Sequence, residues 1–263
     1  MKNATEFVKK FKKFRKSLPA SDTLVNKGGA VHEIIYSSML WNATSKQASG
    51  AYKKLIKSAV DLNEIRVNVI PETIDLIGSN YPQAFERSKR LRTVLNAIYS
   101  REHCMEITSI ESAGKRDVRE YFETLSGITP FVCNRVISLQ YGVAAIPIDD
   151  RTLAALSLNG IISEDADIRE AASWIGRQVK AEDVCGIHAQ LHDWMSSQPA
   201  RAILKSVTKK NTKSVSEPSK SRTATKKKVV KKSKKKSTSK KKVVKKVNKK
   251  TVSKKKVVKK TKK

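Results

Sequence analysis

The stretch LSGITPFVCNRVISLQYGVAAIPIDD, residues 125–150, gathers residue types suited to chemistry on a charged ligand. Gly127 lies in a short apolar turn, where it can adopt a positive φ and let the backbone approach a ligand closely. The helix that follows offers unpaired N–H groups and a positive dipole end to a phosphate. Two carboxylates, Asp149 and Asp150, close the stretch. The structural alternatives are an ordinary helix–helix turn and a helix N-cap.

A second group of potential ligands lies near the end of the helical region. Cys185, His188 and His192 are spaced i, i+3 and i+7, so a helix places them on one side, and both residue types can bind zinc. No fourth ligand lies nearby in the sequence, and the same spacing fits a buried helix face. We therefore predict no metal and no cofactor.

The segment ETLSGITPFVCNRVISLQYG resembles the helix-hairpin-helix of the endonuclease III (HhH-GPD) superfamily of DNA base-excision glycosylases. That family has an apolar residue, Pro, Gly, an apolar residue and Gly before a helix, and Leu125, Gly127 and Ile128 match this pattern. The resemblance implies a helix-hairpin-helix at about residues 117–140. It also implies that Gly127, Ile128 and Thr129 contact the phosphate backbone of double-stranded DNA.

The resemblance further implies a catalytic carboxylate after the second helix of the hairpin. YGVAAIPIDD resembles the glycine turn and apolar pair that precede this carboxylate in the family. The spacing from Gly127 favours Asp149, whereas the apolar register of Leu153 and Leu156 fits Asp150 better. In the family the carboxylate stabilises positive charge developing on the sugar or helps to activate the nucleophile. One of the two could act in catalysis while the other caps the helix.

Two further segments extend the resemblance over residues 30–195. IIYSSMLWNATSKQASGAYKKL resembles the family's early helix pair, and DVCGIHAQLHDW resembles its late helix. Asn42 falls where the family has a polar residue that fills the gap left by a flipped base, and Thr44 matches a threonine just after it. The resemblance thus implies a flipped base as a ligand.

Three departures from the family pattern bear on activity. Counting from Gly127, Phe131 stands where bifunctional members place the Lys that forms a Schiff base with the sugar, and a phenyl ring offers no amine. Thr129 replaces the second hairpin glycine, and Pro130 after it removes a backbone N–H donor. Only Cys185 lies in the C-terminal third, which excludes the four-cysteine iron–sulfur cluster of many members.

The elements that must position these residues are helices. We find no strand alternation, and the first 200 residues predict about ten short helices, hence an all-α fold. The resemblance implies two lobes: one from the early helices through Ile148, the other from the N-terminal helix and the later helices. In that N-terminal helix, apolar residues alternate with lysines at helical spacing, which predicts docking on the body; a helix on a membrane surface or nucleic acid is the alternative. The apolar residues are Phe7, Phe11, Phe14 and Leu18.

Charge divides the 263-residue chain into a body and a tail. Residues 201–263 hold 29 basic residues and one acid, Glu217, a net charge of +28, whereas the other 200 residues carry only +3. The motif KKKVVKK begins at Lys226, Lys240 and Lys254. A segment of Lys, Ser, Thr and Val without aromatic residues cannot bury a core. We therefore predict a helical domain over residues 1–203 and a disordered tail over 204–263.

The tail resembles the lysine-rich tails of linker-histone-like bacterial proteins. Its lysines, including Lys226, Lys240 and Lys254, are suited to neutralising DNA phosphates without reading the sequence. RNA or an acidic protein are alternative counter-anions, and a merely solvating segment is the structural alternative.

Other features of the sequence indicate the cellular compartment of the protein. The three cysteines are odd in number and widely spaced, which argues against a disulfide framework. No apolar stretch approaches the ~18 residues that would span a bilayer, and the basic N-terminus lacks a signal-peptide core. We expect a cytoplasmic, nucleoid-associated monomer that binds no membrane.

Two hypotheses of function remain. The first is a monofunctional DNA glycosylase, which flips a damaged or mispaired base and hydrolyses its glycosidic bond with water. The second is a DNA-binding protein that retains the glycosylase scaffold for an architectural or damage-sensing role. They differ in whether Asp149 or Asp150 faces a base-sized pocket or turns into a helix cap.

Overall fold

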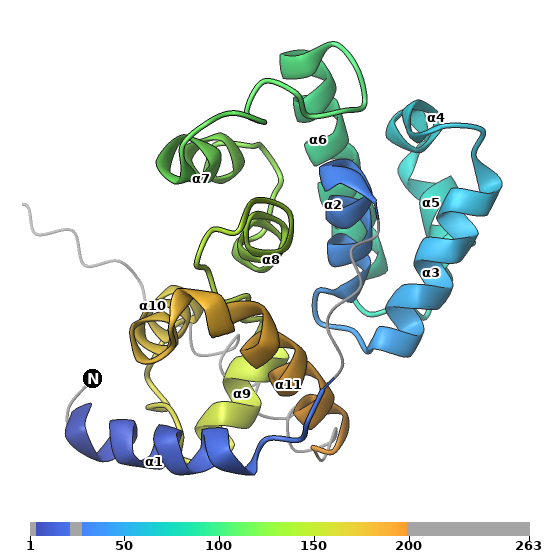
Figure 1. Ribbon diagram of the computed structural model, residues 1–263. Coiled ribbons are helices and arrows are strands. Elements are labelled where there is room, and N and C mark those ends of the chain that lie inside the picture. Colours follow the sequence, from blue (N-terminus) through green and yellow to red (C-terminus); the bar gives the residue numbers. More distant parts are fainter. Residues whose placement is uncertain (1–3, 22–27, 199–263) are drawn as a thin grey trace, which may run out of the picture. The chain divides into compact units, whose positions relative to one another are not determined.

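The computed structural model describes residues 4–21 and 28–198 (Figure 1). Within these ranges the chain forms α-helices, one 3₁₀ turn and no strand, which confirms the all-α prediction. None of the described helices is both long and apolar enough to cross a membrane. The helices are α1 (Ala4–Ser17), α2 (Gly29–Leu40), α3 (Ser45–Ser58), α4 (Leu62–Val67), α5 (Ile70–Ile77), α6 (Ala84–Glu102), α7 (Lys115–Glu123), α8 (Pro130–Tyr141), α9 (Asp150–Leu158), α10 (Ile168–Gln178) and α11 (Val184–Ser196), with η1 (Ala181–Asp183) before α11.

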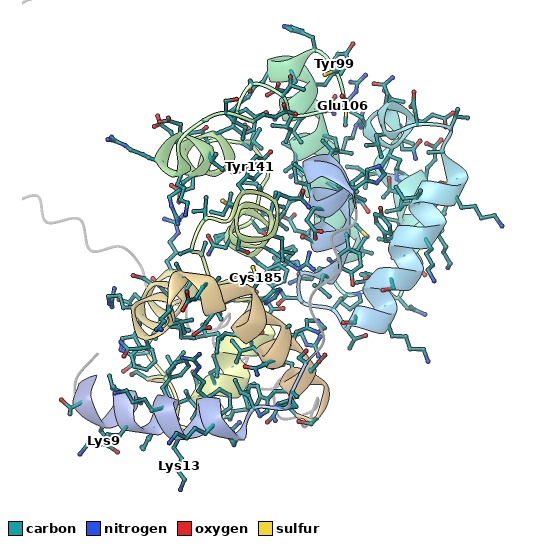
Figure 2. All side chains as sticks on the ribbon, in the orientation of Figure 1. Lys9, Lys13, Tyr99, Glu106, Tyr141 and Cys185 are labelled. Atoms are coloured by element: carbon teal, nitrogen blue, oxygen red, sulfur yellow. The ribbon has the colours of Figure 1, made fainter. Side chains whose placement is uncertain are left out.

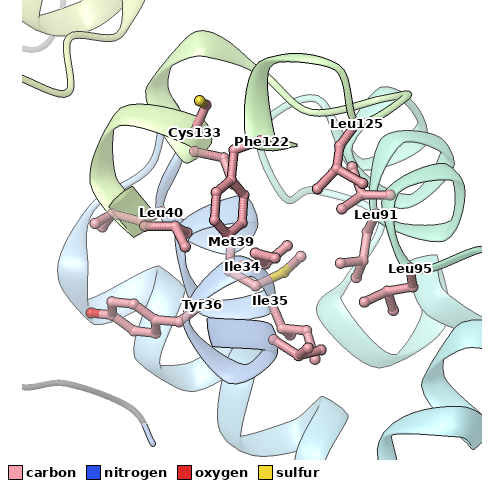
Figure 3. Packing of buried hydrophobic residues seen from close by; sticks show 14 of the residues in the cluster. Ile34, Ile35, Tyr36, Met39, Leu40, Leu91, Leu95, Phe122, Leu125 and Cys133 are labelled. Carbon is pink, nitrogen blue, oxygen red and sulfur yellow. The ribbon is translucent and has the colours of Figure 1, made fainter. Parts of the chain in front are cut away.

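The first lobe is built around α2. Its sequence, GAVHEIIYSSML, is apolar on nearly every side, and such a helix is stable only when neighbours surround it. Helices α3, α6 and α8 pack against it. Ile34 and Met39 of α2 lie beside Leu95 of α6 and Phe122 of α7, and all four side chains are fully buried (Figure 3). Burying each of these contributes about 1.5–3 kcal/mol.

The second lobe joins the N-terminal helix to the last helices. Phe11 of α1 packs edge-on against Trp174 of α10 at 5.5 Å between ring centroids, and Phe14 contacts Trp194 of α11 at 4.8 Å. The lysines of α1 lie on its other face, and Lys9 and Lys13 point away from the lobe (Figure 2). The two-lobed prediction and the docking of α1 are therefore confirmed.

The chain passes from the first lobe to the second earlier than the sequence predicts. The first lobe was expected to extend through Ile148, but Ile146 and Ile148 both belong to the second hydrophobic core. Helix α8 ends at Tyr141 and is capped by Gly142, which adopts a left-handed φ of 61°. The chain then leaves the first lobe, and Ala145 is the last residue of its buried core.

The hairpin forms where the sequence predicts it, between α7 and α8. Gly127 has a φ of 85°, in the left-handed region that favours glycine. A Cβ at this position would lie 2.8 Å from Thr93 Cβ and 3.1 Å from the Arg90 carbonyl oxygen. Gly127 is thus required both by the turn and by the close approach of the hairpin to α6.

We expect Gly127→Ala to lower the free energy of unfolding by about 2–4 kcal/mol, the sum of left-handed strain and overpacking. Gly142→Ala is the matched control, because Gly142 has a φ of 61° and no atom within 4 Å of its Cβ position. The control should lose only about 1 kcal/mol. Urea unfolding measures both, and equal losses would mean that contact with α6 has no effect.

Candidate DNA-binding and catalytic site

Three residues that the sequence singles out separately lie together where the two lobes meet. The backbone N–H of Asn42 donates to Asp149 Oδ2 at 3.0 Å, and its side-chain Nδ2 donates to Asp150 Oδ2 at 2.8 Å. These contacts join positions more than 100 residues apart in sequence. Asn42 has a φ of 56°, a conformation that Asn tolerates better than most residues. The turn after α2 is therefore fixed directly to the start of α9.

Asp149 is the N-cap of α9. Its Oδ1 accepts a hydrogen bond from the Thr152 N–H at 2.8 Å, and its side chain is only 5% exposed. Asp150 is the first residue of the helix and is half-buried. A carboxylate here is stabilised by the N-terminal dipole of the helix. The capping alternative is thus correct for Asp149, and a catalytic role for either carboxylate stays a prediction.

A buried arginine that the sequence analysis missed supports this turn. Arg87 of α6 is 1% exposed and donates to the carbonyl oxygens of Ser38, Trp41 and Pro82. Burial lowers the pKa of Arg87 to about 10, against the opposing effects of Tyr81 and the Asp149 carboxylate. At neutral pH Arg87 is therefore a cation near Asp149. Its spacing of four and eight residues from the buried Leu91 and Leu95 could have revealed it.

The side chain of Asn42 is itself enclosed. It is 8% exposed, and its Nδ2 also lies 3.3 Å from Gln83 Oε1. Among the described residues, no donor is within hydrogen-bond distance of its Oδ1. Filling the space of a flipped base, as the resemblance implies for Asn42, would require the side chain to leave these partners. That role stays a prediction.

The hairpin has few groups that could donate a hydrogen bond to a phosphate. The Thr129 hydroxyl caps α8 by accepting from the Val132 N–H at 3.3 Å, and Pro130 at the first helical position has no N–H. Thr129 is buried, whereas Ile128 is half-buried. The DNA contacts expected of Gly127, Ile128 and Thr129 stay predictions. Lys226, Lys240 and Lys254, the tail positions expected to bind DNA, lie outside the described residues, as does the predicted domain boundary at 203/204.

Phe131 is a core residue. It is 4% exposed, and its ring lies 6.2 Å from that of His188 in α11. One turn further along α8, Arg135 donates to Glu33 of α2, to Ser37 Oγ at 2.9 Å and to His188 Nε2 at 3.2 Å. Burial lowers the pKa of Arg135 to about 9. This buried polar network, which the sequence patterns did not predict, links α2, α8 and α11.

The side chains considered for zinc have other partners. Cys185 Sγ lies 3.6 Å from the Ser138 carbonyl oxygen, His188 accepts from Arg135, and His192 contacts the Ser45 hydroxyl. The described part of the chain contains no group of three His, Cys, Asp or Glu side chains that could hold a metal ion. His188 alone is buried, whereas Cys185 and His192 are half-buried, so the buried-face interpretation holds for His188.

We expect His188 to make stability depend on pH. Burial, and then the nearby Arg135 and His192, hold the pKa of His188 well below its usual range. As pH falls below about 6.5, the unfolded chain binds a proton that the folded chain does not, so stability is lost on acidification. The loss can reach about 1.4 kcal/mol per pH unit. Urea unfolding from pH 8 to 5 should show this slope reduced in His188→Gln but not in His103→Gln, where the residue is exposed. An unchanged slope in His188→Gln would contradict the assignment.

Comparison with known proteins identifies the fold through structure alone. No protein-family model matches the chain, and no curated protein matches it. A trapped covalent complex of endonuclease III with DNA superposes with a TM-score of 0.55 at 16% identity, covering 74% of this chain and 86% of that one. The chain has the helix-hairpin-helix (HhH-GPD) fold of this glycosylase superfamily.

Two other solved structures have the same architecture. A thermostable thymine-DNA glycosylase matches with a TM-score of 0.50 at 14% identity, over 75% of this chain and 87% of that one. An 8-oxoguanine glycosylase/lyase of Clostridium acetobutylicum, in complex with double-stranded DNA, matches with a TM-score of 0.50 at 12% identity, over 73% and 66%. The fold expected from the hairpin motif is therefore confirmed.

Proposed function

We propose that the protein binds double-stranded DNA and acts in base excision repair as a monofunctional DNA glycosylase. The observation that carries this proposal is the convergence of Asn42, Asp149 and Asp150 at the junction of the lobes. The similarity of the fold to glycosylases supports it. In this proposal the hairpin residues Ile128 and Thr129 and the tail lysines hold the phosphate backbone.

The proposed reaction is hydrolysis of the bond between the sugar C1′ and a damaged or mispaired base. As the bond breaks, the electron pair leaves with the base and positive charge develops on the sugar. The carboxylate of Asp149 or Asp150 would stabilise that charge; water would add to C1′ and lose a proton, and the departed base would gain one. Phe131 provides no amine, so no Schiff base forms at that position.

A non-enzymatic DNA-binding function is the second candidate, and one observation favours it. Both oxygens of Asp149 accept backbone N–H groups, those of Thr152 and Asn42. Neither Asp149 nor Asp150 lines the groove of about 640 Å³ that lies between α7, α8 and α10. An architectural or damage-sensing protein would need the carboxylates only for this structural role.

The chemistry of the product tests the enzymatic proposal. Incubation with duplexes that each carry one damaged base should yield strand breaks only after alkali treatment, because a monofunctional enzyme leaves the abasic strand intact. Borohydride should trap no covalent protein–DNA adduct. Efficient trapping would show that another Lys or the N-terminus is the nucleophile and would overturn the monofunctional assignment.

A further inference from the structure

A groove of about 640 Å³ lies along α8, and neither Phe131 nor Arg135 lines it. Pro130, Cys133 and Asn134 line it from α8, and the walls come from α7, α10 and residues 144–146. Its lining thus comes from both lobes. The volume is that of sites for small organic ligands, well above what a single inorganic ion needs.

Three arginines give the groove a positive charge. Arg119 of α7 is partly neutralised by Glu123 at 3.5 Å and also donates to the Ala144 carbonyl oxygen. On α10, Arg177 donates to Ser173 Oγ at 2.7 Å. In residues 4–21 and 28–198, no carboxylate lies within ion-pair distance of Arg169 or Arg177. Two guanidinium groups of one helix therefore line the groove without an acidic partner.

The rest of the lining is largely apolar. Pro130 and Ala144 are exposed, and Ile128 and Ile168 are half-buried, so these four residues contribute hydrocarbon surface. Glu123 is the one carboxylate among the lining residues. Guanidinium groups bind phosphate oxygens in a two-pronged geometry, and an apolar wall accommodates the face of a base or sugar. The combination matches a ligand with one anionic end and one flat, weakly polar end.

We propose that this groove binds a nucleotide unit, with its phosphate on Arg169 or Arg177 and its base against the wall formed by Ile128, Pro130 and Ile168. The unit is either a free nucleoside monophosphate or a nucleotide of the DNA strand held by the hairpin. The second source is considered because Ile128 belongs to both the groove and the hairpin. Binding here requires no base release, so it can be tested whether or not the protein is a glycosylase.

The test uses the full chain and two double variants of equal charge. Arg169→Gln/Arg177→Gln removes the two groove cations, and Lys53→Gln/Lys57→Gln removes two exposed cations of α3 that do not line the groove. All four side chains are exposed, so the cores stay intact. The tail contributes equally to both variants. Binding of deoxyadenosine monophosphate, of inorganic phosphate and of an undamaged duplex is titrated at several salt concentrations.

A free-nucleotide site predicts that the arginine variant binds deoxyadenosine monophosphate at least about 10-fold more weakly than the wild type, with a change under about twofold in the lysine variant. Inorganic phosphate should bind more weakly than the nucleotide. If the occupant is a DNA nucleotide, the arginine variant instead makes the salt slope for the duplex shallower by about two relative to the lysine variant. Equal behaviour of the two variants toward both the nucleotide and the duplex would overturn the proposal.

Discussion

Replacing Asp149 by asparagine is expected to slow base release by about 100-fold or more, with duplex affinity within about twofold of the wild type. A charge that stabilises the transition state contributes to the rate and not to ground-state binding. Asparagine keeps an oxygen for the Thr152 N–H, so α9 stays capped. Its new amide faces the Asn42 N–H, so some stability is lost. Single-turnover release, duplex titration and thermal melting separate these effects.

Asp167→Asn is the matched control for this prediction. Asp167 caps α10 by accepting from the Glu170 N–H at 2.7 Å, so the substitution removes the same charge from a helix cap in α10 rather than in α9. Release should be unchanged in this control. An equal loss from Asp150→Asn alone would move the catalytic assignment by one residue. Unchanged release in Asp149→Asn would show that its carboxylate is only a cap.

Deleting the tail from Lys205 onward is expected to weaken binding to all duplexes by a similar, large factor. The body carries only +3 against +28 in residues 201–263. If about ten tail lysines engage phosphates together, log K falls with log salt with a slope near −9, and the truncated chain shows a much shallower slope. The preference for one base over another should survive, because lysines contact phosphate and not base edges.

The measurement compares a matched and a mismatched duplex from low to physiological salt, with and without the tail. An intact salt slope after truncation would contradict the DNA-anchor role and direct attention to RNA or acidic proteins as partners. Loss of the preference between the duplexes with an intact slope would mean that the tail recognises structure and the body does not.

The fold and the hairpin could be predicted because they follow from local patterns. Gly127 has the left-handed φ that its turn requires, and Phe11 and Phe14 dock as their helical spacing indicates. The choice between Asp149 and Asp150 could not be made from sequence, because an N-cap and a catalytic carboxylate need the same residue type before a helix. Hydrogen bonds from Asn42 and Thr152 identify the cap, and only the folded chain brings Asn42 there.

The buried arginines show a different limit. Arg87 and Arg135 lie on helix faces that are otherwise apolar, and a charged residue there is normally taken to face solvent. Their partners are backbone carbonyl oxygens for Arg87, and Glu33, Ser37 and His188 for Arg135. Except for Pro82, five residues before Arg87, these partners are distant in sequence, so the sequence does not identify them. The arginine-lined groove also depends on residues of α7, α8 and α10 that are distant in sequence.

The central claim is that this helix-hairpin-helix protein releases bases with a carboxylate and without an amine. The most direct test incubates the full chain with a panel of duplexes, each with one damaged or mispaired base, and counts abasic sites under single-turnover conditions. We predict release from at least one duplex by the wild type and by Asp167→Asn, and release that is about 100-fold or more slower by Asp149→Asn. Tight binding to damaged duplexes without abasic sites in any of them would contradict the claim and establish the non-enzymatic function instead.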